Sequence, residues 1–302
     1  MGYRKRAPIV LNITTGDQDG IGPEVTFKAL RRLGPLPGVR FRVFVGSRTK
    51  LPRLSEFKVG ENLAWLPRPE SPAHWVEEAT HHCLRHSKNA LVTAPLSKTT
   101  IVRAGLKDIG HTEILARLTH RKTLHMGFLG QKFNVLLATG HIPLKNVTKE
   151  WNVQTFRAAL RSAKQMQSIL PLQQSRKPIA LVGLNPHAGE DGLLGTEEAW
   201  VRREIQKHKG LKGPLVPDSA FLPQNWGKYS LFIVPYHDQG LIPFKMIHGF
   251  NSGVHLTLGL PFVRTSVDHG TAKEIFGKNL AEAGSMIDAI ETAVELVKRG
   301  AR

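Results

Sequence analysis

Three histidines follow three apolar runs at the same distance. Each run has the pattern of a buried β-strand, and the histidine stands three residues after the last apolar position: His141, His187 and His237. In open α/β sheets the ligand crevice lies outside the carboxyl ends of the strands. Three imidazoles brought there from separate strands form a ligand set for one divalent ion, and they leave positions open for substrate or water.

We therefore predict a catalytic metal site made of these three histidines. The alternative is three ordinary loop histidines among the 14 in the chain. The shared spacing, with glycine or proline shaping each turn, favours the metal. The sequence does not choose among zinc, cobalt, magnesium and manganese, because that choice depends on coordination geometry.

Cationic residues follow the third histidine closely. Lys245, His255 and Arg264 lie within 30 residues of it, and Arg264 comes directly after the apolar run 256–263, which should be buried. A metal ion beside several cations predicts a substrate with a carboxylate and a phosphate group. The alternative for these cations is solvated surface charge.

Acid and base candidates lie in the same part of the chain. Asp238, Asp218 and Lys245 could each transfer a proton, and the sequence does not decide among them, because geometry comes before pKa in naming a base. Lys245 could instead bind phosphate. The single cysteine, Cys83, is predicted to be a helix residue rather than a nucleophile, since its surroundings show no catalytic setting.

A second polar group begins a predicted helix. In the segment Gly110 to Glu113, Thr112 is expected to cap the helix that follows. His111 beside it is either a loop histidine or, with the Thr112 hydroxyl and the helix N-terminus, part of an anion site.

Composition limits the class of protein. The chain has 302 residues, a formal net charge of +18 and one cysteine, which predicts a reducing, cytoplasmic setting. No apolar run approaches the roughly 20 residues of a membrane span, and the apolar stretch near the N-terminus fits a first strand better than a signal peptide. The charge suits anionic small molecules, a solvated face or nucleic acid; scattered cations without interleaved aromatics argue against specific nucleic-acid binding.

Strand and helix patterns alternate along the chain, which predicts an α/β protein with a largely parallel sheet. The predicted strands are 8–14, 39–45, 90–93, 123–130, 133–138, 179–184 and 231–234. Helices are predicted after Pro23, over 75–86, after Gly110, over 153–170 and 197–207, and along the apolar stripe 286–297. The proline-rich stretch 66–72 is predicted to be a loop.

Several motifs together are similar to those of one enzyme family. They are 14–24, the Gly-His-Thr-Glu at 110–113, the Ala-Thr-Gly-His at 138–141, the run 183–190, the Tyr-His-Asp-Gln-Gly at 236–240 and the run 259–272. With these motifs the chain resembles the 4-hydroxythreonine-4-phosphate dehydrogenase family of vitamin B6 biosynthesis, in order from about residue 8 to about residue 298.

The resemblance implies a fold like that of isocitrate and isopropylmalate dehydrogenases, with two α/β domains around a cleft and no Rossmann domain. The implied domains are 1–115 with 255–302, and 116–254. A homodimer with the active site near the subunit interface is also implied. So is a divalent ion on the three histidines named above. Substrate contacts fall on His111, Thr112, Lys245, His255 and Arg264, and the turn with Asp268, Gly270 and Thr271 receives NAD or NADP.

The implied reaction is oxidation and decarboxylation of 4-phosphooxy-L-threonine to 3-amino-2-oxopropyl phosphate. One departure from the family pattern is His255, where asparagine is usual; only histidine can become cationic. The region 46–75 is also shorter than usual. The alternatives are the same chemistry on threonate or erythronate 4-phosphate, and, in another class, a basic nucleic-acid-binding protein without dehydrogenase activity.

Overall fold

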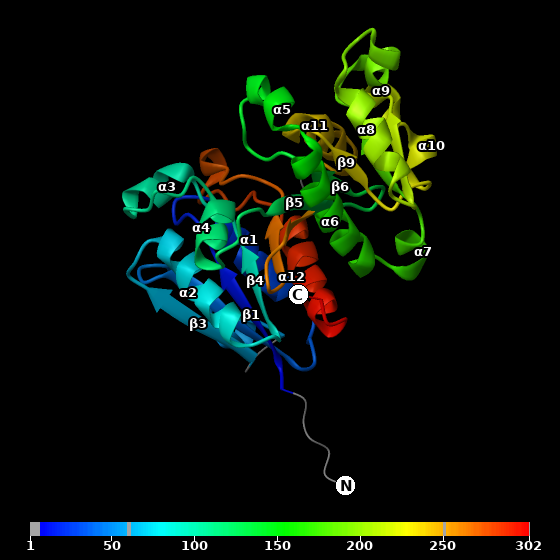
Figure 1. The fold of residues 1–302 in the computed structure, drawn as a ribbon. Coiled ribbons are helices and arrows are strands. Elements are labelled where there is room, and N and C mark those ends of the chain that lie inside the picture. The colour runs from blue at the N-terminus through cyan, green and yellow to red at the C-terminus, as the bar shows by residue number, and fades with distance from the viewer. Residues whose placement is uncertain (1–6, 59–61, 250–251, 302) are drawn as a thin grey trace. The chain divides into compact units, whose positions relative to one another are not determined.

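The computed structural model describes residues 7–58, 62–249 and 252–301 (Figure 1). The chain divides into two compact units, unit 1 with Met1–Leu124 and Phe250–Arg302, and unit 2 with His125–Gly249. The expected domains instead changed after residue 115 and after residue 254. Unit 1 keeps the whole of the fourth helix, because that helix packs beside the second one.

Unit 1 contains a mixed sheet between two helical layers. Its strands are β1 (Ile9–Thr14), β2 (Val39–Gly46), β3 (Leu63–Arg68), β4 (Asn89–Thr93), β10 (Val254–Leu258) and β11 (Arg264–Val267). Its helices are α1 (Gly22–Arg32), α2 (Pro72–Arg85), α3 (Lys98–Arg103), α4 (His111–Leu118) and α12 (Gly284–Lys298). The strand order is β3-β2-β1-β4-β11-β10, parallel except for the β10–β11 pair.

Apolar faces explain the layers of unit 1. The inner stripe of α2, with Trp75, Val76 and Ala79, packs on β1 and β4 together with α4, while α1 and α12 pack against each other and α12 covers the other face (Figure 1). The predicted strands and helices of this unit are present. The predicted loop over 66–72 was wrong in its first half, since β3 extends to Arg68; β3 is an edge strand, where Pro67 removes no needed ladder hydrogen bond.

Unit 2 contains a five-stranded sheet. Its strands are β5 (His125–Leu129), β6 (Val135–Leu137), β7 (Ile179–Val182), β8 (Leu211–Leu215) and β9 (Phe232–Val234), in the order β5-β6-β9-β7-β8. Its helices are α5 (Leu144–Glu150), α6 (Val153–Ile169), α7 (Leu172–Ser175), α8 (Glu197–Gln206), α9 (Pro217–Ala220), α10 (Pro223–Trp226) and α11 (His237–His248). The three central strands are mutually parallel, so β6, β9 and β7 end at the same edge.

The core of unit 2 is aromatic. Phe133 packs against Phe232 and Phe244, which bring β9 and α11 together over one face of the sheet. Helix α6 packs on β5, β6 and β9, and the side chain of Asn152 caps it by accepting hydrogen bonds from the first turn. None of the described helices is long and apolar enough to cross a membrane.

A buried histidine couples the stability of unit 2 to pH. His125 on β5 is 5% exposed, and its Nδ1 lies 2.9 Å from Oγ of Ser162 on α6. Burial, with a smaller contribution from the charge of Arg161, lowers the pKa of His125 to about 4. The unfolded chain therefore binds more protons than the folded chain between about pH 6.5 and 4.

We expect His125 to cost the fold about 3 kcal/mol as the pH falls through that window, since each pKa unit corresponds to roughly 1.4 kcal/mol. Urea unfolding at pH 7 and pH 4.5 should show a smaller loss of stability in His125→Asn than in the parent. The matched control is His120→Asn, at an exposed position with φ of 53°. An unchanged pH dependence in His125→Asn would contradict the assignment.

Candidate functional site

A buried guanidinium dominates the polar groups of unit 1. Arg264 begins β11 and is 1% exposed. Its Nη1 donates to Oγ1 of Thr257 at 2.8 Å, and its Nη2 donates to Oγ1 of Thr93. No described carboxylate pairs with it, and burial alone lowers the pKa of Arg264 to about 9. An uncompensated buried charge is costly for a fold, so Arg264 marks a candidate anion site.

Two histidines lie beside this guanidinium. Nδ1 of His255 on β10 is 3.2 Å from Nη1 of Arg264. His111 is the first residue of α4; burial and the charge of Arg264 hold the pKa of His111 well below its usual value, so the ring is neutral. The Nε2 atom of His111 has no hydrogen-bond partner among the described residues. An anion entering here would meet one fixed cation and two imidazoles.

Thr112 lies in the first turn of α4 and does not cap it. The cap position is Gly110, with no side-chain cap hydrogen bond, so the predicted role of Thr112 was wrong. The physical reason is that Gly110 adopts extended backbone and His111 already has helical geometry, which moves the helix start one residue earlier than the threonine. Thr112 keeps a hydroxyl next to His111.

The glycine turn after β11 borders a cavity within unit 1. This cavity has a volume of about 630 Å³, and its lining includes Ile21, Gly270 and Thr271. The N–H of Ile21 donates to the carbonyl of Thr271 at 2.9 Å, and Lys273 pairs with Asp19 at 2.7 Å. These contacts fasten the turn to the loop after β1. Asp268 is 7% exposed and is not among the lining residues; its N–H donates to Oγ of Ser285.

In unit 2 the ends of β6 and β9 bring two of the predicted ligands together. The N–H and the hydroxyl of Thr139 both donate to the carbonyl of Pro235, which ties the two loops side by side. The ring centroids of His141 and His237 are then 5.1 Å apart. Two imidazoles on one tetrahedral zinc ion, with Zn–N near 2.0–2.1 Å, have centroids roughly 5 Å apart.

His187 follows β7 on a loop with unusual backbone geometry. Five successive residues, 187–191, have positive φ between 40° and 79°, and only one of them is glycine. L-residues in this left-handed region are strained, and such strain persists only where the surroundings impose it. The ring of His187 is exposed, and among the described residues no group of three His, Cys, Asp or Glu side chains is placed to hold a metal ion. The spacing of His141 and His237 is compatible with a shared ion, and the complete ligand set remains a proposal.

A buried carboxylate from α8 holds this strained loop. Oε1 of Glu198 accepts the N–H groups of Leu184 and Asn185 at 2.9 and 2.8 Å, and Oε2 accepts Nδ2 of Asn185. Arg202 donates to the carbonyl of Ala188 from the same helix. This support was not predicted from the sequence, because an acidic residue in the first turn of a helix usually only stabilises that helix through its dipole.

The remaining acid and base candidates also lie in unit 2. Oδ1 of Asp238 lies 2.7 Å from Nδ1 of His237, an arrangement that orients a ligating imidazole. Asp218 is exposed on α9, which packs against the loop of His187. Lys245 is half-buried two turns along α11 from His237. Helix α11 itself was not predicted.

Cys83 lies in α2, as predicted, and burial raises the pKa of its thiol. Such a thiol is a poor nucleophile. The cysteine accepts a weak hydrogen bond from Asn12.

The fold is that of the β-decarboxylating dehydrogenases. The isocitrate dehydrogenase of Methylococcus capsulatus superposes with a TM-score of 0.54 at 13% identity, over 96% of this chain and 86% of that one. A crystal structure titled 4-hydroxythreonine-4-phosphate dehydrogenase from Klebsiella pneumoniae is more similar, with a TM-score of 0.78 and 29% identity over 98% and 99% of the two chains. The predicted fold class is confirmed.

Sequence comparison defines the family. Residues 70–293 match the model of the pyridoxal phosphate biosynthetic protein PdxA, and the chain belongs to that family of oxidoreductases. It is 35% identical to the 4-hydroxythreonine-4-phosphate dehydrogenase of Sulfurihydrogenibium sp. (strain YO3AOP1), over 96% of this chain and 99% of the relative. It is also 35% identical to the D-threonate 4-phosphate dehydrogenase of Bordetella bronchiseptica, over 95% and 92%.

The loop of His187 provides a test of the role given to Glu198. Replacing Glu198 by Ala leaves the backbone N–H groups of Leu184 and Asn185 without an acceptor. Each unsatisfied group costs about 1–3 kcal/mol of stability. We expect urea unfolding to show a loss of roughly 2–4 kcal/mol. Glu291→Ala, on the exposed face of α12, is the control and should change stability by less than about 0.5 kcal/mol. Equal effects of the two substitutions would exclude the supporting role.

Proposed function

We propose that this protein oxidises 4-phosphooxy-L-threonine with NAD or NADP and decarboxylates the product to 3-amino-2-oxopropyl phosphate. The observation that carries the proposal is the buried, unpaired Arg264 with its neutral neighbour His111. A guanidinium donates in a planar fork that matches a carboxylate or a phosphate oxygen pair. Family membership supplies the reaction class.

In this proposal unit 1 binds the anionic part of the substrate. Arg264 supplies charge, while His111, Thr112 and His255 supply hydrogen bonds. Thr93 and Thr257 fix the guanidinium, so its direction is set before the substrate arrives. Such preorganisation lowers the entropy cost of orienting the substrate.

Unit 2 is proposed to hold a divalent ion on His141, His187 and His237. When bound, zinc, cobalt, magnesium or manganese would act as a Lewis acid for both the oxidation and the decarboxylation. The chain's own contribution is to orient the ligands. The contact between Asp238 and His237 fixes one ring, and Glu198 holds the loop of another.

The proton from the substrate hydroxyl needs an acceptor. The candidates remain Asp238, Asp218 and Lys245. Because Asp238 is already engaged by His237, its contact supports an orienting role, which leaves Asp218 and Lys245 as the better acceptors. Lys245 is also a candidate for the substrate phosphate.

The cavity beside Gly270 and Thr271 is the proposed place for the dinucleotide, which accepts the hydride when bound. Its volume lies in the range of small-molecule sites. Asp268 is proposed to act by fixing the turn through Ser285 rather than by lining the cavity.

A second candidate substrate is D-threonate 4-phosphate, the substrate in the name of the Bordetella relative. It carries a hydroxyl where 4-phosphooxy-L-threonine carries an amino group. His255 favours it, because Nη1 of Arg264 can only donate to Nδ1 of the neutral ring, which leaves the ring proton on Nε2; an N–H at Nε2 can donate to a hydroxyl but not to an ammonium group. Erythronate 4-phosphate also carries a hydroxyl at that position and is tested with it.

We also propose a homodimer in the cytoplasm. Ile242 and Met246 lie one turn apart on α11 and are 60% and 79% exposed, and Ile247 is 43% exposed. These exposed apolar side chains support an interface between two copies. Light scattering after size exclusion distinguishes a dimer from a monomer of 33.5 kDa. The single buried cysteine is consistent with a reducing compartment.

The test of the function is NADH or NADPH formation at 340 nm with 4-phosphooxy-L-threonine, D-threonate 4-phosphate and erythronate 4-phosphate, each with and without a chelator. The proposal expects the highest kcat/KM with the first substrate and loss of activity with the chelator. A higher value with D-threonate 4-phosphate would select the second candidate. No turnover with any of the three, together with salt-sensitive RNA binding, would favour a nucleic-acid-binding protein.

Replacing Arg264 by Met separates function from stability. We expect kcat/KM to fall at least about 100-fold, because the anion loses its charge-assisted hydrogen bonds. The free energy of unfolding should not fall, since an apolar side chain of similar length removes an uncompensated buried charge. Kinetics and urea unfolding of the same preparation measure both. Arg121→Met, an exposed position, is the control. Full activity in Arg264→Met would sink the substrate assignment.

Cobalt binding tests the ligand set without turnover. Calorimetric titration of Co²⁺ into the metal-free protein should show at least about tenfold weaker binding in each of His141→Ala, His187→Ala and His237→Ala. His81→Ala, at an exposed position, should bind as the parent does. If only His141→Ala and His237→Ala weakened binding, the ligand set would be limited to these two histidines.

A further inference from the structure

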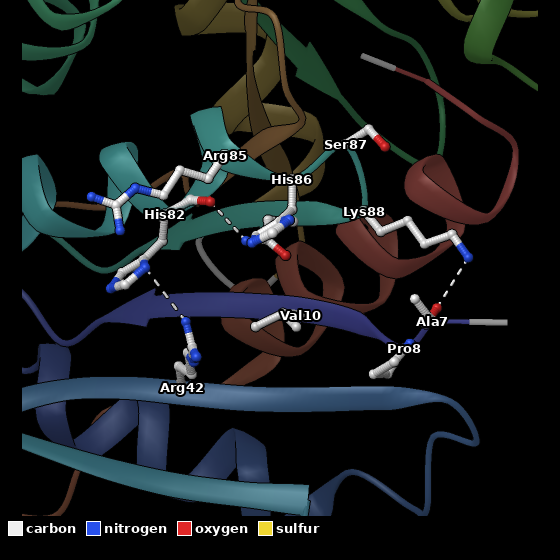
Figure 2. A pocket seen from close by; sticks show the side chains of 10 residues that line it. Ala7, Pro8, Val10, Arg42, His82, Arg85, His86, Ser87 and Lys88 are labelled. Atoms are coloured by element: carbon white, nitrogen blue, oxygen red, sulfur yellow. Dashed lines mark hydrogen bonds between the residues drawn. The ribbon is translucent and has the colours of Figure 1, made fainter. Parts of the chain in front are cut away.

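A second polar cavity lies at the opposite end of the unit 1 strands. Its volume is about 690 Å³, and it is lined by Ala7, Pro8, Val10, Arg42, His82, Arg85, His86, Ser87, Lys88 and Asn89 (Figure 2). These residues surround the amino-terminal ends of β1 and β4. Thr93, which holds Arg264, is at the carboxyl end of β4, and a five-residue strand spans roughly 17 Å. The two polar regions are therefore separate.

The lining carries three permanent cations and no carboxylate. Arg42 comes from β2, Arg85 from the end of α2 and Lys88 from the segment before β4. The imidazoles of His82 and His86 add two further nitrogen-bearing groups. Among the described residues, none of the three cations forms an ion pair, although Lys and Arg side chains form such pairs elsewhere in the described parts of the chain. The positive potential of the cavity is thus not neutralised from within the described chain.

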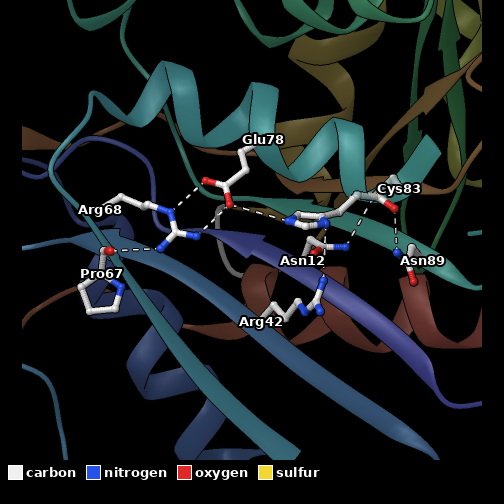
Figure 3. Close-up of polar contacts among 8 residues, drawn as sticks. Asn12, Arg42, Pro67, Arg68, Glu78, Cys83 and Asn89 are labelled. Carbon is white, nitrogen blue, oxygen red and sulfur yellow. Dashed lines mark hydrogen bonds and ion pairs between the residues drawn. The ribbon is translucent and has the colours of Figure 1, made fainter. Parts of the chain in front are cut away.

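The carboxylate that contacts the lining, through His82, is already paired with another residue. Glu78 on α2 accepts two hydrogen bonds from Arg68, at 2.8 and 2.7 Å (Figure 3). Between this pair and the cavity stands His82, whose Nε2 is 3.6 Å from Glu78 and whose Nδ1 is 3.5 Å from Arg42. Burial and the charge of Arg42 lower the pKa of His82, so a neutral ring separates Arg42 from the carboxylate.

A structural explanation for these cations is that they stabilise the C-terminus of α2, whose carbonyls carry partial negative charge. A neutral side chain already binds one of these carbonyls: Nδ2 of Asn89 donates to the carbonyl of His82 at 2.7 Å. Lys88 instead donates to the carbonyl of Ala7, on another segment. The side chain of Arg85 is exposed and forms no hydrogen bond with a described residue.

We propose that this cavity binds a small anion that carries two or more phosphate groups. Two guanidinium forks and one ammonium, brought from three elements, suit several phosphate oxygens rather than one carboxylate. The volume is that of a small-molecule site. No Phe, Tyr or Trp lines the cavity, so a nucleic-acid base would find no stacking surface there.

Inorganic triphosphate is the probe. Calorimetric titration of the full chain should show binding that weakens at least about tenfold in Arg85→Gln and in Arg42→Gln, because each substitution removes a charge-assisted contact. The side chain of Arg85 is exposed and forms no hydrogen bond or ion pair with a described residue, so its variant tests the site even if Arg42→Gln proves unstable. Lys58→Gln, which removes an exposed charge of unit 1 outside the lining, should bind as the parent does.

Enzyme kinetics distinguish this anion site from the proposed active site. Arg85→Gln should keep the kcat and KM of the parent in the absence of triphosphate. The proposal is overturned if the parent does not bind triphosphate, if Arg85→Gln binds it as the parent does, or if Lys58→Gln weakens it equally. Binding of a single-stranded RNA without binding of triphosphate would also overturn it, in favour of nucleic acid.

Discussion

The site in unit 1 depends on one uncompensated charge. Arg264 lies at the start of β11 in the middle of a sheet, and no carboxylate of the described residues pairs with it. Hydroxyl groups of Thr93 and Thr257 satisfy part of its hydrogen-bonding capacity but none of its charge. The apolar core around it offsets this cost in the free protein. In the proposed function, pairing with the anionic group of the substrate would remove the cost and so contribute to binding.

In unit 2 the unfavourable energy lies in the backbone conformation of one loop. The left-handed segment after β7 holds non-glycine residues in a strained region, and Glu198 with Asn185 offsets that strain through hydrogen bonds. The two other strand ends need no such device, since the hydrogen bonds of Thr139 to Pro235 place His141 beside His237 directly. Rigid loops on adjacent parallel strands are what a metal site requires.

Much of this arrangement could be predicted from periodicity. The apolar runs before His141 and His237 form β6 and β9, and the run before His187 forms β7, which are neighbours in the sheet. The burial of Arg264 also followed from the apolar run before it. Interactions between distant segments could not be predicted: Glu198 acts on a loop 13 residues away, and only the folded chain shows that contact. Thr112 failed as a cap because cap positions depend on backbone angles that composition does not fix.

The most direct measurement is a crystal structure of the protein with 4-phosphooxy-L-threonine bound. We predict that a carboxylate or phosphate oxygen of the substrate lies within hydrogen-bonding distance of the Arg264 guanidinium, with His111 as a second contact. This prediction would be contradicted if the bound substrate left Arg264 in contact with Thr93 and Thr257 alone, and its anionic groups were held by other side chains.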